Sequence, residues 1–272
     1  MKILTAILSC SDTQDRANSC LNTWIKDIKP PHNYFFYGDE KQSKIMMNTW
    51  NCTPDKGECR SRLPEKTYKM LEMSLDYDWD FLFKCDDDTY VVFDMLVELL
   101  QTYNPLENLY LGYTIGHLHE SIREHLKSIG LHKSKKLQNL LKISNGDTLR
   151  LKGLLSPKLI NDHDNTFRFR WAQGGAGYIL TRSSVIKCLN SLKLFYQNES
   201  KNNRAEDYSV GLALEMEGVH LNHIDQLNTH APQIAKKYQS VCVNDIIKDN
   251  KITTHYVKAE TMQLIHESIY KK

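Results

Sequence analysis

The chain has 272 residues, 41% of them apolar, which is enough to bury a large core in one domain. Its 35 basic residues nearly balance its 33 acidic ones, so the formal net charge of +2 gives no electrostatic reason to expect nucleic acid or an anionic membrane as a partner. No run approaches the roughly 20 apolar residues that cross a bilayer. We therefore expect a soluble protein without a transmembrane segment.

Strand-like and helix-like segments alternate along the first part of the chain. Their apolar periodicity and turn residues predict a βαβ opening followed by a crossover helix and a buried strand. In order, these are a strand at Lys2–Ser9, a helix at Asp12–Ile28, a strand at Asn33–Glu40, a helix at Leu63–Asp78 and a strand at Asp80–Cys85. This alternation predicts an α/β fold.

The second part of the chain continues the pattern after an interruption. It predicts a helix at Val91–Tyr103 and a strand at Asn108–Tyr113. From about 114 to 167 the sequence becomes rich in Lys and His, and we interpret it as a helical excursion from the sheet. After this excursion the apolar periodicity resumes, and it predicts a glycine-rich turn followed by a short strand and a helix. A helix at Arg204–Glu217 and a C-terminal helix after His255 complete the predicted elements.

Three consecutive aspartates, Asp86–Asp88, follow the buried strand, at the edge of an α/β sheet where ligands bind. Adjacent carboxylates near a core need a positive partner, and with the following Thr89 they form an oxygen-rich site suited to Mg²⁺ or Mn²⁺. The alternative of an exposed acidic turn conflicts with the apolar runs on both sides. The spacing of an EF-hand loop is absent.

Three further groups have both a functional and a structural interpretation. Glu206 and Asp207 start a predicted helix, where capping alone explains an acid. His255 ends a strand-like run and is by itself compatible with a structural role. The GGAG segment, Gly174–Gly177, lacks the spacing of a phosphate-binding loop and is compatible with a simple tight turn.

Four segments, in this order, resemble glycosyltransferase family 31, whose relatives include Fringe and the core 1 β1,3-galactosyltransferases. They are DFLFKCDDDTYVVFDMLVELLQTYNPLENLYLGY, WAQGGAGYILTRSSV, AEDYSVGLALEMEGVHL and THYVKAETM. The resemblance implies one GT-A catalytic domain over residues 1–272, with a Rossmann-like mixed sheet flanked by helices and a helical insertion. It also implies a divalent cation, usually Mn²⁺, a UDP-sugar donor, and an inverting β1,3-transfer of a hexose, galactose favoured over GlcNAc or glucose, to a glycan or glycoprotein.

The resemblance also implies roles for individual residues in the metal and base sites. Asp88 and His255 would be metal ligands, Asp87 a ligand or a neighbour of the diphosphate, and Asp86 a contact to the ribose or sugar. Asp207 would be the general base.

The remaining implied contacts concern the donor. Glu206 would lie in the donor site beside the base, Lys66 would reach the diphosphate, and Gly174, Gly175 and Ala176 would let the backbone approach the donor sugar. The chemistry needs such a set, because a divalent cation neutralises the departing diphosphate and a carboxylate takes the proton of the attacking hydroxyl.

Two other functions stay open at this stage. A non-catalytic GT-A relative would act as a chaperone or bind glycans, and such relatives typically lose the aspartate motif, which this chain keeps. A metal-dependent phosphohydrolase would cleave its nucleotide substrate without an acceptor. Family members usually carry a signal anchor and luminal disulfides, whereas this chain begins with a strand pattern and has seven scattered cysteines, of which only Cys52 and Cys59 flank a turn suited to a bridge. We therefore favour a cytoplasmic location.

Overall fold

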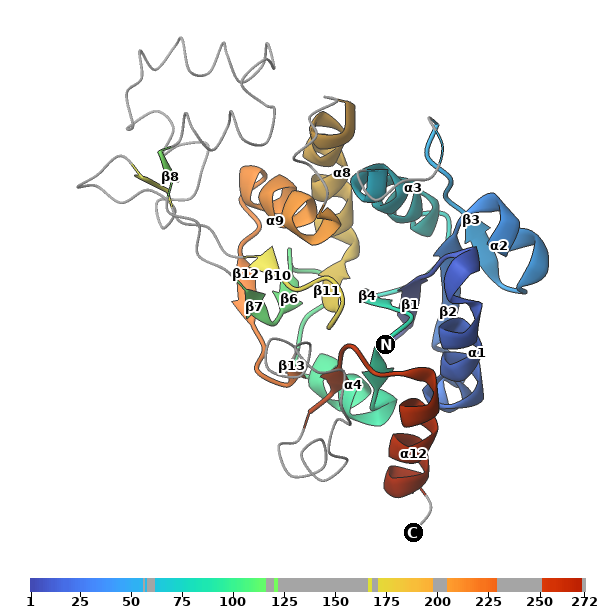
Figure 1. The fold of residues 1–272 in the computed structure, drawn as a ribbon. Helices are drawn as coiled ribbons and strands as arrows, with labels where there is room; N and C mark the ends of the chain where they lie inside the picture. Colours follow the sequence, from blue (N-terminus) through green and yellow to red (C-terminus); the bar gives the residue numbers. More distant parts are fainter. Residues whose placement is uncertain are drawn as a thin grey trace, which may run out of the picture.

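The computed structural model of the protein describes residues 1–55, 57, 62–115, 120–121, 166–167, 171–197, 205–228 and 251–270. A seven-stranded mixed sheet lies at its centre (Figure 1). In spatial order its strands are β12 (Leu221–His223), β6 (Tyr110–Gly112), β11 (Tyr178–Thr181), β4 (Phe81–Asp86), β1 (Ile3–Leu8), β2 (Asn33–Gly38) and β3 (Thr49–Asn51).

Strand direction determines which loops meet at the edge of this sheet. β4, β1, β2 and β3 run parallel, and so do β6 and β12, but β11 is antiparallel to both of its neighbours. Tyr178, at the start of β11, lies opposite Lys84, near the end of β4. The glycine-rich segment before β11 and the aspartates after β4 therefore lie at the same edge.

Helices cover both faces of the sheet (Figure 1). One face carries α3 (Leu63–Ser74), α8 (Arg182–Gln197) and α9 (Glu206–Met216), and the other carries α1 (Gln14–Asn22), α4 (Phe93–Leu100) and α12 (Ala259–Tyr270). The short α2 (Glu40–Ile45) joins β2 to β3. The predicted fold class, a mixed sheet flanked by helices, is confirmed.

The sequence of the central strands explains the two layers of helices. Leu4 and Ala6 of β1 belong to the apolar cluster beneath α3, α8 and α9, whereas Ile3 and Ile7 belong to the cluster beneath α1, α4 and α12. Successive side chains of a strand point to opposite faces, so a strand that is apolar throughout needs a cover on both. This is why the runs predicted as buried strands lie in the middle of the sheet.

The described residues also form three smaller sheets outside the central one. β14 (Thr253–Thr254) lies between β13 (Leu227–Asn228) and β5 (Tyr90–Val91). The other two are β10 (Trp171–Ala172) with β7 (Thr114–Ile115), and β8 (Glu120–Ser121) with β9 (Thr166–Phe167). The antiparallel pairing of β14 with β5 places Thr254 opposite Tyr90, so that His255 lies next to the aspartate segment.

The structure corrects several predicted boundaries. The single helix predicted at Asp12–Ile28 is wrong: 3₁₀ turns at Ser11–Thr13 and Trp24–Asp27 flank the shorter α1. The helix ends where Thr23, at φ −123° and ψ −114°, leaves the helical region and its hydroxyl bonds the carbonyl of Ser19 at 2.7 Å. Like α1, the helix predicted from Val91 is shorter and starts at Phe93, because Val91 pairs with Thr253 in a sheet.

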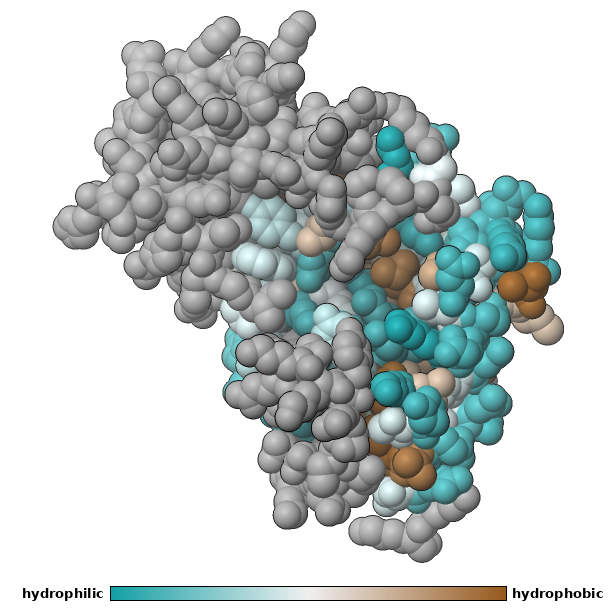
Figure 2. Space-filling model, in the orientation of Figure 1, coloured by the Kyte–Doolittle hydropathy of each residue, from teal (hydrophilic) through white to brown (hydrophobic). Residues whose placement is uncertain are grey.

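Other predictions lie largely outside the described residues. These include most of the helical excursion at about 114–167, and Cys59, the second member of the suggested Cys52–Cys59 bridge. Within the described ranges, no helix is both long enough and apolar enough to cross a membrane. Figure 2 shows one face of the molecule; among the described residues visible on it, hydrophilic ones predominate and hydrophobic ones form small separate patches.

Candidate active site

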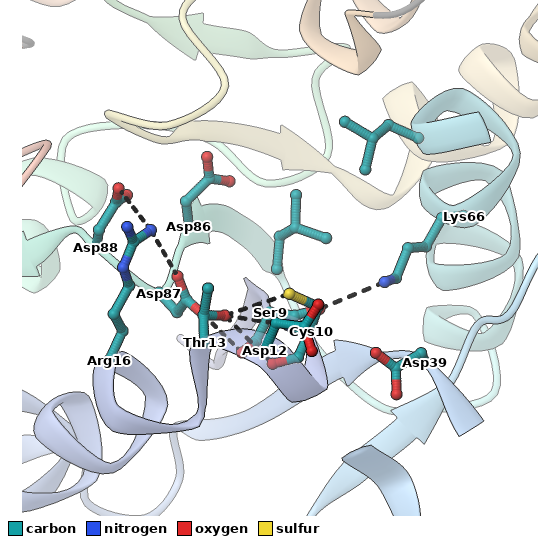
Figure 3. A pocket seen from close by; sticks show the side chains of 12 residues that line it. Ser9, Cys10, Asp12, Thr13, Arg16, Asp39, Lys66, Asp86, Asp87 and Asp88 are labelled. Atoms are coloured by element: carbon teal, nitrogen blue, oxygen red, sulfur yellow. Dashed lines mark hydrogen bonds and ion pairs between the residues drawn. The ribbon is translucent and has the colours of Figure 1, made fainter. Parts of the chain in front are cut away.

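Two adjoining cavities open at the edge of the sheet where β1 and β4 end. The first, of about 410 Å³, is lined by residues that follow β1 and β2 and by the three aspartates (Figure 3). The second, of about 430 Å³, is lined by the glycine-rich segment, the start of α9 and His255. Asp86 lines both cavities, with Leu8 and Leu63. The segments that the sequence predicted as separate candidates thus meet around one carboxylate.

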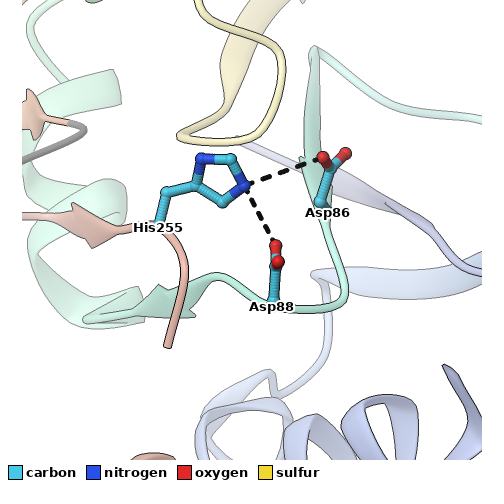
Figure 4. A group of neighbouring side chains, drawn as sticks. All are labelled: Asp86, Asp88 and His255. Atoms are coloured by element: carbon cyan, nitrogen blue, oxygen red, sulfur yellow. Dashed lines mark ion pairs between the residues drawn. The ribbon is translucent and has the colours of Figure 1, made fainter. Parts of the chain in front are cut away.

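Asp86, Asp88 and His255 form a compact group (Figure 4). One ligand atom from each lies within 4.8 Å of the others, and His255 Nε2 is 3.0 Å from Asp88 Oδ1 and 3.9 Å from Asp86 Oδ2. A backbone bond from Val257 N to the carbonyl of Asp88, at 2.9 Å, holds the His255 segment beside the aspartates. Two carboxylates and an imidazole are a donor set for a divalent cation.

Asp87 stands apart from this group, although the sequence placed it among the metal ligands. Its carboxylate is buried and accepts hydrogen bonds from the hydroxyls of Ser9, at 2.6 Å, and Thr13, at 2.5 Å (Figure 3). Burial raises the pKa of Asp87 to about 7, and these two hydroxyls oppose the rise. In this structure Asp87 therefore links the segment after β4 to Ser9 and Thr13 and lines the first cavity, where the predicted position beside a diphosphate stays open, while Asp86 lies with Asp88 and His255.

Lys84 is the buried positive charge next to this site. Its Nζ donates to Asp86 Oδ1 at 2.8 Å, to Glu206 Oε1 at 2.5 Å and to the Gly174 carbonyl at 3.2 Å. Burial opposes the charge, but Asp86 and Glu206 outweigh it and raise the pKa of the ammonium well above its ordinary value. All three donors of one lysine are therefore used to join three separate segments of the site.

The two acids at the start of α9 do not cap it. The N-cap is Ala205, and no side chain bonds there as a cap. Asp207 Oδ2 instead accepts from Gly174 N at 3.0 Å, while Glu206 Oε2 accepts from the Tyr178 hydroxyl at 3.2 Å. Burial raises the pKa of Asp207, with the Gly174 N–H opposing the rise, which makes this carboxylate a stronger base than an exposed one.

The glycines of the GGAG segment leave room for the acids and the histidine. A Cβ on Gly174 would lie 2.4 Å from Glu206 Oε1, and one on Gly175 would lie 1.9 Å from His255 Cε1. Both glycines line the second cavity, whereas Ala176 is fully buried and is not among the residues that line either described cavity. The tight-turn interpretation is therefore incomplete, because the missing side chains let Glu206 and His255 approach the loop.

Substituting Gly175 by alanine is expected to displace the imidazole of His255. The new methyl group would overlap the ring, and the side chain can move away more easily than the backbone. We expect the affinity for Mn²⁺ to fall as much as in His255→Ala, with a small change in Tm. Calorimetric titration with Mn²⁺ and a thermal melt measure the two effects; an Mn²⁺ affinity that falls in His255→Ala but not in Gly175→Ala would show that the methyl group does not displace the imidazole.

Two basic side chains from different helices line the first cavity. Lys66, predicted from the sequence to reach the diphosphate, is buried on α3, lines the cavity and donates to the Ser9 carbonyl at 3.3 Å. Arg16 on α1 was missed by sequence reasoning, and it lies 3.2 Å from Asp88 Oδ2 and 3.9 Å from Asp87 Oδ1. The cavity is therefore lined by two basic side chains as well as by carboxylates, a combination that can bind an anionic ligand together with a cation.

A family model described as Fringe-like matches residues 2–268 of the chain. The chain belongs to the Fringe-like family. This membership supports a glycosyltransferase and agrees with the GT-A arrangement expected from the sequence.

Several solved glycosyltransferases are remotely similar to this Fringe-like chain. The galactosyltransferase LgtC, in complex with donor and acceptor sugar analogues, is 12% identical, with a TM-score of 0.43 and coverage of 98% of this chain and 96% of that one. Apo GlyE of Streptococcus pneumoniae is 12% identical, with a TM-score of 0.46 and coverage of 94% of this chain and 54% of GlyE. The Mn/GDP form of core-mannan synthase A of Aspergillus fumigatus is 10% identical, with a TM-score of 0.38 and coverage of 82% of this chain and 72% of the synthase. Likenesses this remote assign no donor, acceptor or linkage.

The donor atoms of the Fringe-like site fit a divalent cation. Burial opposes ionisation of Asp86, but Lys84 and His255 outweigh it and lower the pKa of this carboxyl, so it is charged at neutral pH. The imidazole occupies space that a side chain at position 175 would fill, and it stacks on the ring of Tyr256 with 3.7 Å between the ring centroids. Tyr256 itself has a φ of 60°, a conformation that non-glycine residues adopt mainly where the surroundings impose it.

Proposed function

We propose that the protein is a metal-dependent, inverting β1,3-glycosyltransferase that transfers a hexose from a UDP-sugar to a hydroxyl of a glycan or glycoconjugate. Galactose is the favoured hexose, with GlcNAc and glucose as alternatives. The observation that carries the proposal is that, in a Fringe-like chain, Asp86 and His255 line the same cavity as the Asp207 carboxylate, and that Asp88 completes the group with Asp86 and His255 from the adjoining cavity. The cavity thus combines a candidate site for the leaving diphosphate with a candidate base.

The donor would occupy both cavities. The nucleotide fits the first, where Lys66 and Arg16 offer positive charge to the diphosphate and Ser9 and Thr13 fix the loop through Asp87. The hexose fits the second, beside Gly174 and Gly175. Asp86, Asp88 and His255 would hold Mn²⁺ or another divalent cation, which when bound stabilises the negative charge that develops on the departing diphosphate.

Asp207 would act as the general base. Its carboxylate takes the proton from the acceptor hydroxyl while the oxygen forms a bond to the anomeric carbon, and the bond from that carbon to the diphosphate breaks with its electron pair leaving on UDP. An attack from the face opposite the leaving group inverts the anomeric centre. Gly174 N holds one carboxylate oxygen at 3.0 Å, so the base is oriented before the acceptor binds.

The test is a UDP-release screen of UDP-hexoses with Mn²⁺ and simple glycoside acceptors. We expect release that depends on both Mn²⁺ and acceptor, and a product whose new β-linkage is visible by NMR. Acceptor-independent cleavage of the donor would instead indicate the phosphohydrolase alternative. Binding of UDP-sugar without any turnover would indicate a chaperone or glycan-binding relative.

The metal assignment predicts that Asp88→Asn and His255→Ala each weaken Mn²⁺ binding by roughly tenfold or more, since loss of even outer partners of a metal site has that effect. UDP binding in the presence of Mn²⁺ should weaken in parallel, while the fold stays intact. Calorimetry measures both affinities. Asp15→Asn and His223→Ala, the same substitutions at exposed positions outside the proposed metal group, are the controls. A variant that binds Mn²⁺ and UDP like the parent removes its residue from the proposed ligand set.

A further inference from the structure

Gln173 precedes the glycine-rich segment and lines the second cavity. Its side-chain Oε1 is buried and accepts no hydrogen bond, although the residue as a whole is only half-buried. Among the described residues that line this cavity, the other buried side-chain atom without a partner is Nδ1 of His255, a residue already placed in the metal group. The amide of Gln173 therefore has hydrogen-bonding capacity that the described part of the chain does not use.

The carboxylates that line this cavity already have partners. Asp207 accepts from the backbone of Gly174 and Tyr208, and Lys84 holds Asp86 and Glu206. These bonds fix the carboxylates in place for charge and for proton transfer. Gln173 can therefore form a hydrogen bond with a neutral sugar hydroxyl without giving up a bond to the protein.

The backbone that carries Gln173 is well fixed. Its N–H donates to the Tyr113 carbonyl at 3.0 Å, directly after the pairing of β10 with β7. The next residue, Gly174, is held through its carbonyl by Lys84 and through its N–H by Asp207. With the backbone fixed in this way, rotation within the side chain adjusts the amide, and a half-turn of the amide exchanges its donor and acceptor ends.

We propose that Gln173 is a specificity-determining residue that hydrogen-bonds a hydroxyl of the transferred hexose. The inference rests on the proposed function, and it assigns this hydroxyl to the donor sugar for a geometric reason. The second cavity extends from Asp86 and His255, on the side of the leaving group, to Asp207, on the side of the attacking hydroxyl, and the transferred hexose must lie between them. A donor without the matching hydroxyl would leave a buried amide unpaired, which is the kind of contact that discriminates strongly between substrates.

The test compares the parent with Gln173→Leu across UDP-galactose, UDP-glucose and UDP-GlcNAc. We expect kcat/KM for the preferred donor to fall about tenfold and that for the poorer donors to fall less than about threefold, which narrows the donor preference. The affinity for UDP alone, measured by calorimetry with Mn²⁺, should not change, because UDP lacks the hexose. Gln101→Leu, the same substitution at an exposed position at the end of α4, should match the parent throughout.

Three results would overturn the inference while leaving the proposed function intact. These are an unchanged donor preference, an equal loss with all donors, and a rise in KM for the acceptor alone. A parent that transfers no hexose contradicts the proposed function instead. In that case the ratio of UDP-hexose to UDP affinity still tests Gln173, and a ratio unchanged by Gln173→Leu would overturn its role.

Discussion

Replacing Asp207 by asparagine is expected to lower the turnover number for hexose transfer by on the order of 10² to 10⁴, the usual contribution of a positioned general base. The UDP-sugar affinity should stay close to the parent value, because proton removal assists the transition state and not donor binding. Asparagine keeps an oxygen that can accept from Gly174 N, so the loop and the Tm should change little. Steady-state UDP release measures the rate, and calorimetry measures the affinity.

Glu206→Gln is the comparison for Asp207→Asn. Glu206 is buried between Lys84 and the Tyr178 hydroxyl, and its proposed place is in the wall of the donor site. The neutral amide keeps the shape and retains an acceptor for the hydroxyl, so we expect a smaller loss of rate than for Asp207→Asn. The reverse order of losses would make Glu206 the base, and unchanged rates in both variants would refute the mechanism at its central step.

Acid pH should inhibit transfer through Asp207. Burial raises the pKa of this carboxyl above the ordinary aspartate value, so its proton-accepting form is lost at a higher pH than for an exposed aspartate. The rate should therefore fall as the pH falls through this raised pKa. The residual rate of Asp207→Asn should lack that step, and a pH profile of kcat for both proteins tests the difference.

The central strands were predictable because each carries its own signal. Phe81 to Cys85 is apolar except for Lys84, and such short runs between turn residues are typical of strands buried on both faces. The ends of elements were less predictable, since they depend on partners far along the chain. Val91 continues the apolar pattern of α4, yet its pairing with Thr253 makes it a strand residue. No local window of sequence contains that information.

The order of motifs predicted most of the polar residues that line the second cavity, but only Lys66 and the three aspartates among those that line the first. The mutual contacts of these residues were not predictable. The compact group of possible metal ligands contains Asp86, which the family resemblance assigned to the ribose or sugar, and a signal for this placement was present in the sequence. Residues two apart on a strand point to the same side, so Lys84 and Asp86 at the end of β4 belong together and Asp87 points away. The sequence required a positive partner for the aspartates, and Lys84 is part of it.

Arg16 gave no comparable signal. It lies at a partly exposed position of α1, where an arginine is common, and its contact with Asp88 depends on the packing of α1 beside the end of β4. A long-range ion pair of this kind has no periodicity and no local motif. The same applies to Gln173, whose proposed role rests on a side-chain Oε1 without a partner at a cavity wall that only the folded chain defines.

Replacing Lys84 by methionine is expected to destabilise the fold by about 3 kcal/mol, because removing one partner of a buried ion pair leaves the other charge without compensation. For a domain of this size that corresponds to a fall in Tm of roughly 6–12 °C. Lys84 joins Asp86, Glu206 and the Gly174 carbonyl, so both proposed halves of the active site should loosen together. Thermal and urea unfolding measure the loss, with the exposed Lys41→Met as a control expected to stay within about 0.5 kcal/mol.

The pH dependence of this loss identifies its cause. Burial already raises the pKa of Glu206 to about 7 with Lys84 present, and without the lysine it must rise further. An acid whose pKa is higher in the folded state than in the unfolded state binds more protons when folded, so the stability of Lys84→Met should recover as the pH falls towards the ordinary range of glutamate. The double variant Lys84→Met/Glu206→Gln removes both charges and should be more stable than Lys84→Met at pH 8. A loss that is the same at all pH values and is not relieved by Glu206→Gln would show that Lys84 contributes through its packing and not through its charge.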